Sequence, residues 1–117
     1  ACLVEGTHVR DFDVVPTELG FAPGQPGDLA GGSAADNAAR ARAILGGESG
    51  TAADTVVLNA GAALFVSGIA GTLAEGCEKA RETIDAGEAT SRLDALAAFS
   101  RREADVAVPS AGRSEDT

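Results

Sequence analysis

The sequence predicts a mostly α-helical chain of about four helices, preceded by an N-terminal β-hairpin and followed by a disordered C-terminal tail. Two extended runs open the chain, a Gly- and Pro-rich stretch follows them, and helix start and stop signals recur after residue 33. One predicted helix is apolar on all sides and needs more neighbours than the other elements supply. We therefore expect the chain to be the C-terminal part of a larger α/β domain whose sheet lies upstream.

The hairpin is predicted from extended runs at 1–5 and 8–15, which flank a turn at Gly6-Thr7 and end at Pro16. A lone hairpin is marginally stable in water, so we expect this one to belong to a larger sheet. Residues 16–32 hold three of the four prolines and five glycines. They predict an ordered connecting loop with one helical turn at 17–19.

The first two helices are predicted from their caps. Ser33 with Asp36 three residues later is typical of an N-cap, and Gly46-Gly47 supplies a stop, which gives a helix over 34–45. Thr51 with Asp54 opens a second helix that is predicted to run to Gly68. Because residues 56–66 are apolar on every side, we expect this helix to be buried on most sides.

The third and fourth helices are amphipathic. A capping box of Thr72 and Glu75 opens the third, which is predicted to end at Gly87. Its inward face is predicted to hold Leu73, Cys77, Ala80 and Ile84, and its water-facing side Glu75, Glu78, Lys79 and Glu82. Ser91 with Asp94 opens a shorter helix to about Ser100, with Leu93, Leu96 and Ala97 inward. The predicted organisation is thus a domain portion over 1–100 and a disordered tail over 101–117.

The charge and composition exclude several classes of partner. The net charge is −9 at pH 7, the pI is about 4.4, and aromatic residues make up 3 %. An acidic surface repels phosphate backbones and anionic headgroups, and base-stacking modules need aromatic platforms, so we expect no nucleic-acid and no membrane partner. No run approaches the 18 apolar residues of a membrane span, and the sequence predicts a soluble, cytoplasmic protein.

Several side chains are candidates for a site, but each has a simpler interpretation. We predict that His8 is an exposed strand residue, that the carboxylate groups Asp11/Asp13 and Glu75/Glu78/Glu82 are solvated, and that the turns at 30–33 and 46–51 are helix stops and caps. Cys2 and Cys77 are predicted to be small buried apolar side chains, because neither a disulfide framework nor a zinc site fits two distant cysteines. Asn59 is predicted to be buried and to bond a neighbouring backbone segment.

The ordered series of segments resembles the C-terminal end of the anthranilate phosphoribosyltransferase family. The similarity covers Leu3 to Ser100 and is carried by segments 3–6, 9–14, 16–21, 31–38, 57–68, 73–76, 80–82, 84–87 and 93–96. The two most specific segments are Gly31-Gly32-Ser33-Ala34-Ala35-Asp36-Asn37-Ala38 and the Leu58-Asn59-Ala60-Gly61-Ala62-Ala63-Leu64 helix. The tail from Arg101 onward has no counterpart in this resemblance.

The resemblance implies a small helical domain, a larger α/β domain and a homodimer. It implies transfer of the phosphoribosyl group from phosphoribosyl pyrophosphate to anthranilate in tryptophan biosynthesis, with Mg²⁺ on the diphosphate. The family's Gly-rich diphosphate loop, its anthranilate-positioning Arg and its Asp-Glu metal pair are expected upstream of this chain. We therefore assign no catalytic, substrate-binding or metal residue here, and we expect the isolated chain to be an inactive scaffold fragment.

Two other functions stay open at the level of the sequence. A related glycosyltransferase or nucleoside phosphorylase would share the large domain. A non-catalytic acidic helical interaction module would need the 117 residues to fold alone, with their apolar helix faces covered by one another or by a partner.

Overall fold

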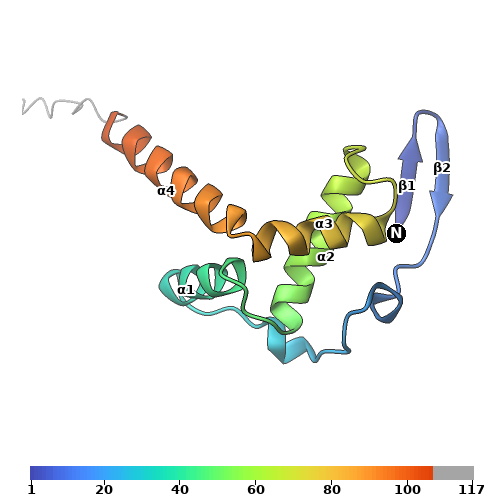
Figure 1. Cartoon of the computed structure of the whole chain (residues 1–117), viewed down its shortest axis with the longest axis horizontal. Coiled ribbons are helices and arrows are strands. Elements are labelled where there is room, and N and C mark those ends of the chain that lie inside the picture. Colours follow the sequence, from blue (N-terminus) through green and yellow to red (C-terminus); the bar gives the residue numbers. More distant parts are fainter. Residues whose placement is uncertain (107–117) are drawn as a thin grey trace, which may run out of the picture.

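The computed structural model describes residues 1–106 and confirms four helices after an N-terminal hairpin (Figure 1). Side chains are described for residues 1–103. The elements, in chain order, are strands β1 (Cys2–Glu5) and β2 (His8–Asp11), the 3-10 helices η1 (Pro16–Leu19) and η2 (Pro26–Leu29), and helices α1 (Ala34–Leu45), α2 (Thr51–Val66), α3 (Leu73–Asp85) and α4 (Glu88–Val106).

The hairpin pairs β1 and β2 in antiparallel register, with Cys2 opposite Asp11 and Glu5 opposite His8. Gly6 supplies the turn with φ +61°, a backbone conformation that other residues rarely adopt. The second strand ends at Asp11 instead of reaching residue 15, because only the four residues opposite β1 find a partner strand. Val4 and Val9 keep 63 % and 66 % of their surface exposed, so the hairpin has no core of its own.

The loop over 16–32 contains two 3-10 turns where the sequence predicted one. The first, η1, falls at the expected place and begins with Pro16. The second, η2, begins at Pro26, and Asp28 stabilises it because its Oδ2 accepts from the backbone N–H of Gln25 at 2.8 Å. The signal for η2 is the pattern of a proline followed two residues later by an aspartate.

Helix α1 has the predicted bounds and cap. The Ser33 hydroxyl accepts from the Asp36 N–H at 3.2 Å, and Asp36 Oδ2 accepts from the Ser33 N–H at 3.1 Å. The N-cap of α2 is Gly50, with φ +132°, so Thr51 is the first helical residue rather than the cap, and the helix ends at Val66 rather than Gly68.

The expectation that α2 is buried on most sides is wrong within this chain. Only Val57 and Gly61 are buried, and Val56 and Val66 are exposed, because α3 covers only one side of the helix. The small core lies at that contact and consists of Phe21, Val57, Cys77 and Ala80, with Leu73 and Ile84 packed against it as predicted.

Two glycines allow α2 and α3 to approach closely. A Cβ at Gly61 would lie 2.7 Å from the backbone nitrogen of Cys77, and a Cβ at Gly76 would lie 2.9 Å from the carbonyl carbon of Gly61. Real Cβ atoms essentially never approach other atoms within 3.0 Å. The two helices can therefore cross at this separation only because both positions lack a side chain.

Helix α3 has half of its predicted capping box. Thr72 accepts from the Glu75 N–H at 3.1 Å, but Glu75 Oε2 accepts from the Gly71 N–H at 2.8 Å instead of from Thr72. The helix ends at Asp85, two residues before Gly87. Glu75, Glu78 and Glu82 are exposed as predicted, whereas Lys79 is half-buried.

Helix α4 is longer than predicted at both ends. It begins at Glu88, directly after Gly87 with φ +76°, and runs to Val106. The prediction of a disordered tail is therefore wrong for residues 101–106. Residues 107–117 lie outside the described part of the chain. Leu93 and Ala97 are half-buried as expected, but Leu96 is 63 % exposed because no described element covers that face.

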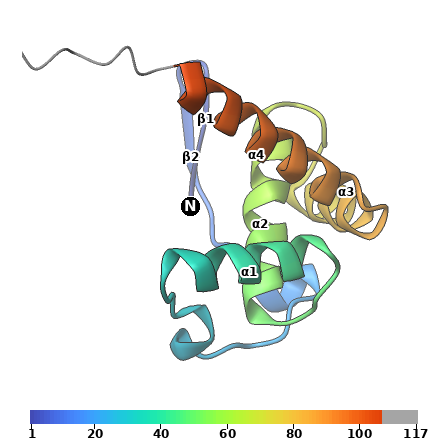
Figure 2. The same ribbon diagram turned by 90° about the vertical axis from the view of Figure 1, so that its left-hand side faces the viewer.

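The arrangement is open. Arg42 of α1 reaches Asp94 of α4 at 2.8 Å, and the Thr90 hydroxyl donates to the Leu45 carbonyl at 2.8 Å, while the rest of α4 projects away from the other helices (Figure 1 and Figure 2). The radius of gyration is 19.6 Å, whereas a compact domain of this length has about 13 Å.

Candidate functional site

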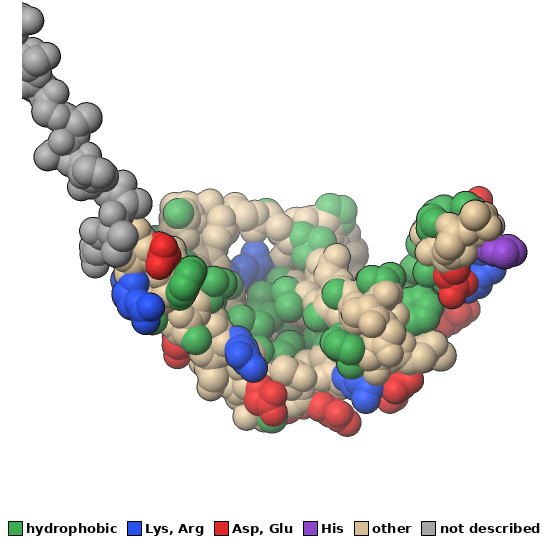
Figure 3. All heavy atoms as spheres, turned by 90° about the horizontal axis from the view of Figure 1, so that it is seen from above, with side chains coloured by type: hydrophobic (Ala, Val, Ile, Leu, Met, Phe, Trp, Pro, Cys, Tyr) green, Lys and Arg blue, Asp and Glu red, His purple; other side chains and the backbone are tan. Residues whose placement is uncertain are grey.

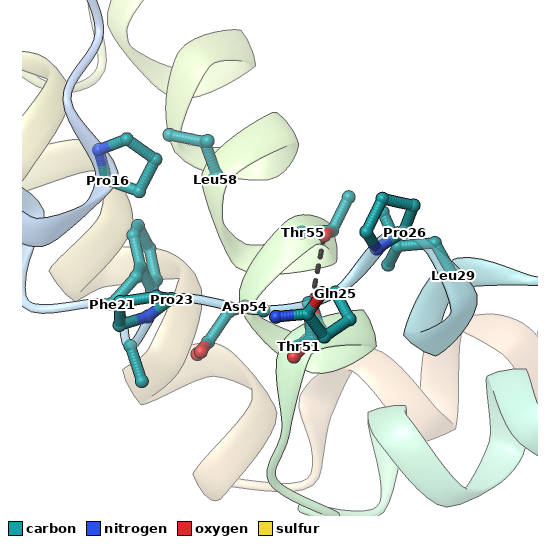
Figure 4. A pocket seen from close by; sticks show the side chains of 12 residues that line it. Pro16, Phe21, Pro23, Gln25, Pro26, Leu29, Thr51, Asp54, Thr55 and Leu58 are labelled. Atoms are coloured by element: carbon teal, nitrogen blue, oxygen red, sulfur yellow. Dashed lines mark hydrogen bonds between the residues drawn. The ribbon is translucent and has the colours of Figure 1, made fainter.

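A concavity with a defined wall lies between the 16–29 segment and the first two turns of α2 (Figure 4). Its volume is about 410 Å³. We call it the proline pocket. Its apolar wall is formed by Pro16, Phe21, Pro23, Pro26, Leu29 and Leu58. The polar side chains that line it are Gln25, Thr51, Asp54 and Thr55.

Two arginines and one aspartate hold the wall of the proline pocket in place. The Arg81 guanidinium of α3 lies over the Phe21 ring, 4.5 Å from its centroid. Arg40 of α1 donates to the backbone carbonyls of Asp28 and Ala30 at 2.6 and 2.8 Å. The Thr51 hydroxyl donates to Asp28 Oδ2 at 3.2 Å, which joins η2 to the start of α2.

The chemistry that this pocket offers is limited. Asp54 is its one ionisable side chain among the described lining residues, and Thr55 already donates its hydroxyl to the Thr51 carbonyl at 2.8 Å (Figure 4). General acid–base or nucleophilic catalysis needs a positioned partner for such a carboxylate, and no described side chain of the pocket provides one. The described lining is therefore mostly apolar and offers no pair of catalytic groups.

The carboxylates and the histidine that the sequence singled out do not converge. His8 is exposed at the hairpin turn, as predicted. Asp11 and Asp13 are both exposed, as predicted; Asp11 ends β2 and Asp13 lies beyond the strand. Glu75 lies 3.7 Å from Lys79 on α3, an exposed ion pair of small energetic weight.

Asn59 and Cys2 differ from the expectations. Asn59 is exposed, and its Nδ2 donates at 2.8 Å to the Thr55 carbonyl of its own helix, so the predicted burial and the predicted bond to another segment are wrong here. The reason is that α2 has an uncovered side. Cys2 is exposed on β1, whereas Cys77 is 1 % exposed, as predicted, and its burial raises the pKa of its thiol.

The Gly-rich turns act as helix stops and caps, as predicted. Gly47 has φ +100° after α1, and Asn37 closes the 31–33 turn by accepting from the Gly32 N–H at 2.9 Å and donating to the Gly32 carbonyl at 3.1 Å. Hydrogen bonds from the Ser33 hydroxyl and backbone lower the pKa of Asp36. Within residues 1–106, no group of three His, Cys, Asp or Glu side chains could hold a metal ion.

No helix in the described part of the chain is long and apolar enough to cross a membrane.

Comparison with known proteins assigns the family. Residues 2–90 match the glycosyl transferase family, a/b domain, which is more than half of the chain. The chain belongs to this glycosyl transferase family. The match begins at β1 and ends within α4, so the hairpin, both 3-10 turns and the α2–α3 core all lie inside the glycosyl transferase domain.

Two individual relatives of this glycosyl transferase chain are anthranilate phosphoribosyltransferases. It is 46 % identical over 98 residues to an anthranilate phosphoribosyltransferase of Paramagnetospirillum magneticum, covering 84 % of this chain and 28 % of the relative. It is 49 % identical over 91 residues to anthranilate phosphoribosyltransferase 2 of Streptomyces coelicolor, covering 78 % and 27 %. The resemblance drawn from the sequence is confirmed, and the chain spans less than a third of the length of these relatives.

The sequence did not single out the proline pocket. Its signal was present in the three prolines that surround Phe21 and Gly24. The lining from α2 could not be anticipated, because Thr51 and Leu58 reach the pocket only through the packing of the loop on that helix.

Proposed function

We propose that this chain is the C-terminal portion of an anthranilate phosphoribosyltransferase and acts there as scaffold. The observation that carries the proposal is that relatives at 41 to 49 % identity, among them those of Streptomyces coelicolor and Natronomonas pharaonis, share that name. In the proposed reaction the amine nitrogen of anthranilate forms a bond to the ribose carbon of phosphoribosyl pyrophosphate and loses one proton. The bond from that carbon to the diphosphate breaks, and the diphosphate leaves with its electron pair.

The geometry of the chain suits a supporting role. Transfer of this kind depends on holding two substrates in a fixed orientation, and loops do this only when the elements beneath them are rigid. The contact of α2 and α3 through Gly61 and Gly76 lets two backbones touch with little side-chain entropy to lose. Hydrogen bonds also hold the 25–30 segment in place. Arg40 attaches it to α1 through the Asp28 carbonyl, and Thr51 attaches it to α2 through the Asp28 carboxylate.

Mg²⁺, a homodimer and a cytoplasmic location are further parts of the proposal. The described residues do not fit Mg²⁺, because no three of their acidic, His or Cys side chains converge, and we derive no step through the metal from this chain. In the proposed enzyme the metal ligands and the catalytic loops belong to the part of the α/β domain outside this chain. The subunits pair through the small domain, which also lies outside it. A cytoplasmic location suits an enzyme of amino-acid biosynthesis.

The proposal is tested in a chimera in which this chain replaces the aligned 98 residues of the Paramagnetospirillum magneticum relative. Loss of anthranilate fluorescence is followed in the presence of phosphoribosyl pyrophosphate and Mg²⁺. The chimera is expected to turn over anthranilate, and the 117-residue chain alone is expected not to.

Two results would overturn the proposal. One is a folded chimera that leaves anthranilate unchanged, or that cleaves a nucleoside with inorganic phosphate instead, as a nucleoside phosphorylase would. The other is turnover by the isolated chain that a substitution within it abolishes.

A further inference from the structure

Helix α4 has an exposed face that combines two large hydrophobic side chains with two opposite charges. Arg92, Leu96, Phe99 and Glu103 follow one another at spacings of four, three and four residues. At about 100° per residue they lie within about 60° of one another around the helix axis, so they form one stripe, which we call the α4 stripe. Leu96 is 63 % exposed and Phe99 is 56 % exposed, and Arg92 and Glu103 are exposed at the two ends of the stripe.

The α4 stripe faces away from the contacts that attach α4 to the rest of the chain. Those contacts are the hydrogen bond of Thr90 to the end of α1 and the ion pair of Asp94 with α1, and both lie on the opposite side of the helix. Beyond them α4 projects outward (Figure 1 and Figure 2). Figure 3 shows hydrophobic, basic and acidic side chains close together at this end of the chain, beside the residues drawn in grey. Among the described side chains, neither Arg92 nor Glu103 has an ion-pair partner.

The composition of the α4 stripe differs from that of a face buried inside a domain. Residues 56–66 of α2 are apolar apart from Asn59, whereas the stripe has a charge at each end. Burying Arg92 or Glu103 without a partner of opposite charge would be costly. The resemblance to the family also ends at Ser100, so Glu103 lies in a part of α4 that the resemblance does not cover. The partner of the stripe therefore has to offer an acidic group, two hydrophobic side chains and a basic group, in that order.

A second copy of α4 in antiparallel orientation offers this order of groups. With a two-fold axis midway between residues 97 and 98, Arg92 of one copy lies opposite Glu103 of the other. Leu96 lies opposite Phe99 in the same way, because the two positions are equally far from the axis. Spacings of three and four residues are also those at which two long helices pack their side chains together. A parallel copy, by contrast, would place Arg92 opposite Arg92.

We infer that the α4 stripe is a self-association surface, on which α4 of a second copy of this chain packs in antiparallel orientation. This contact is distinct from the homodimer of the proposed function, in which the small domains outside this chain pair. Each copy has a net charge of −9, which opposes association, but physiological salt screens charges that are more than about 8 Å apart. The opposite charges of the stripe lie closer than this. Each copy contributes two large hydrophobic side chains, so the contact is small and we expect a weak, reversible dimer.

The test measures the mass of the 117-residue chain by sedimentation equilibrium, from micromolar to millimolar concentration at physiological ionic strength, with a reductant that keeps Cys2 reduced. The wild-type chain is expected to dimerise reversibly. Arg92→Glu puts like charges opposite each other at both ends of the contact, so it is expected to weaken the dimer about tenfold, and Glu103→Arg is expected to do the same. The double variant Arg92→Glu/Glu103→Arg exchanges the two charges and is expected to associate as the wild type does. Arg101→Glu is the matched control, because it makes the same change in charge on the opposite side of α4, and it is expected to alter the affinity by less than about twofold.

Three results would overturn the inference, each with far-UV circular dichroism showing that the variants are folded as the wild type is. One is a chain that stays monomeric over the whole range of concentration. Another is a dimer that Arg92→Glu and Arg101→Glu weaken equally, or that the double variant does not restore, because another surface would then hold the two copies together.

The third result concerns the chimera described above, which is expected to show the same dependence of mass on concentration and on the charges at positions 92 and 103. A chimera whose mass does not respond to them would mean that the remainder of the domain covers the α4 stripe. An inactive chimera refutes the proposed function alone, since the mass does not depend on turnover.

Discussion

Replacing Gly76 by Ala should destabilise the chain, although Ala is the better helix former. The new Cβ would lie 2.9 Å from the carbonyl carbon of Gly61 and closer still to its oxygen, while ordinary contacts begin at 3.4 Å. The carbon alone then requires α2 and α3 to separate by about 0.5 Å, and overpacking of this kind costs about 1–3 kcal/mol. Because the contact with the Gly61 oxygen is closer still, we expect a cost at the upper end of this range. Helix propensity returns about 1 kcal/mol, so the expected net loss in the free energy of unfolding is about 2 kcal/mol.

The assay is urea unfolding of the 117-residue chain followed by far-UV circular dichroism. Gly27→Ala is the matched control, because a Cβ there meets nothing within 4 Å and Gly27 does not have a positive φ. It should be neutral or stabilise the chain by up to about 1 kcal/mol, through the unfolded state. A Gly76→Ala variant as stable as the wild type would refute the close contact of the two helices.

Three further outcomes follow from individual side chains. Folding lowers the pKa of Asp36, so the Asp36 carboxylate stabilises α1 fully at pH values above its ordinary pKa of 3.8. This stabilisation is lost as the pH falls through the lowered pKa. Asp36→Asn should therefore flatten the dependence of the urea midpoint on pH in this acidic range. Asn59→Ala should change the free energy of unfolding of the isolated chain by less than about 0.5 kcal/mol, since Asn59 is exposed, and a loss above 1 kcal/mol would contradict that placement. Iodoacetamide should modify Cys2 in the native chain and Cys77 only after unfolding, as read by peptide mass, because burial raises the pKa of the Cys77 thiol; equal rates would contradict it.

Local signals predicted most of the helices. The N-cap of α1 is formed by Ser33 with Asp36, and that of α3 by Thr72 with Glu75. Each cap lies within four residues of sequence, so the starts of α1 and α3 can be predicted from the sequence. The sequence predicts the start of α4 three residues late, because Ser91 with Asp94 has the pattern of a helix cap, whereas the helix begins directly after Gly87. Its extension past Ser100 has no local start or stop signal that would mark it.

The surroundings of α2 could not be predicted in this way. An apolar sequence such as that of residues 56–66 indicates that a helix needs neighbours, but it does not indicate which chain segment provides them. Asn59 was expected to be buried for that reason, and it is exposed because α3 covers one side only. The proline pocket depends in the same way on long-range packing, through the contact of Arg81 with Phe21.

We propose that this chain supports the chemistry of the enzyme and supplies none of its reacting groups. The most direct measurement is the steady-state kcat of the chimera with His8→Ala and, separately, with Asp54→Asn. His8 is the only histidine of the sequence, and Asp54 is the one ionisable side chain among the described lining residues of the proline pocket. We predict kcat within about twofold of the unsubstituted chimera, since loss of a general acid or base costs about 10²–10⁴-fold. A fall in kcat of a hundredfold or more at unchanged Tm would place catalytic chemistry within this chain and contradict the account.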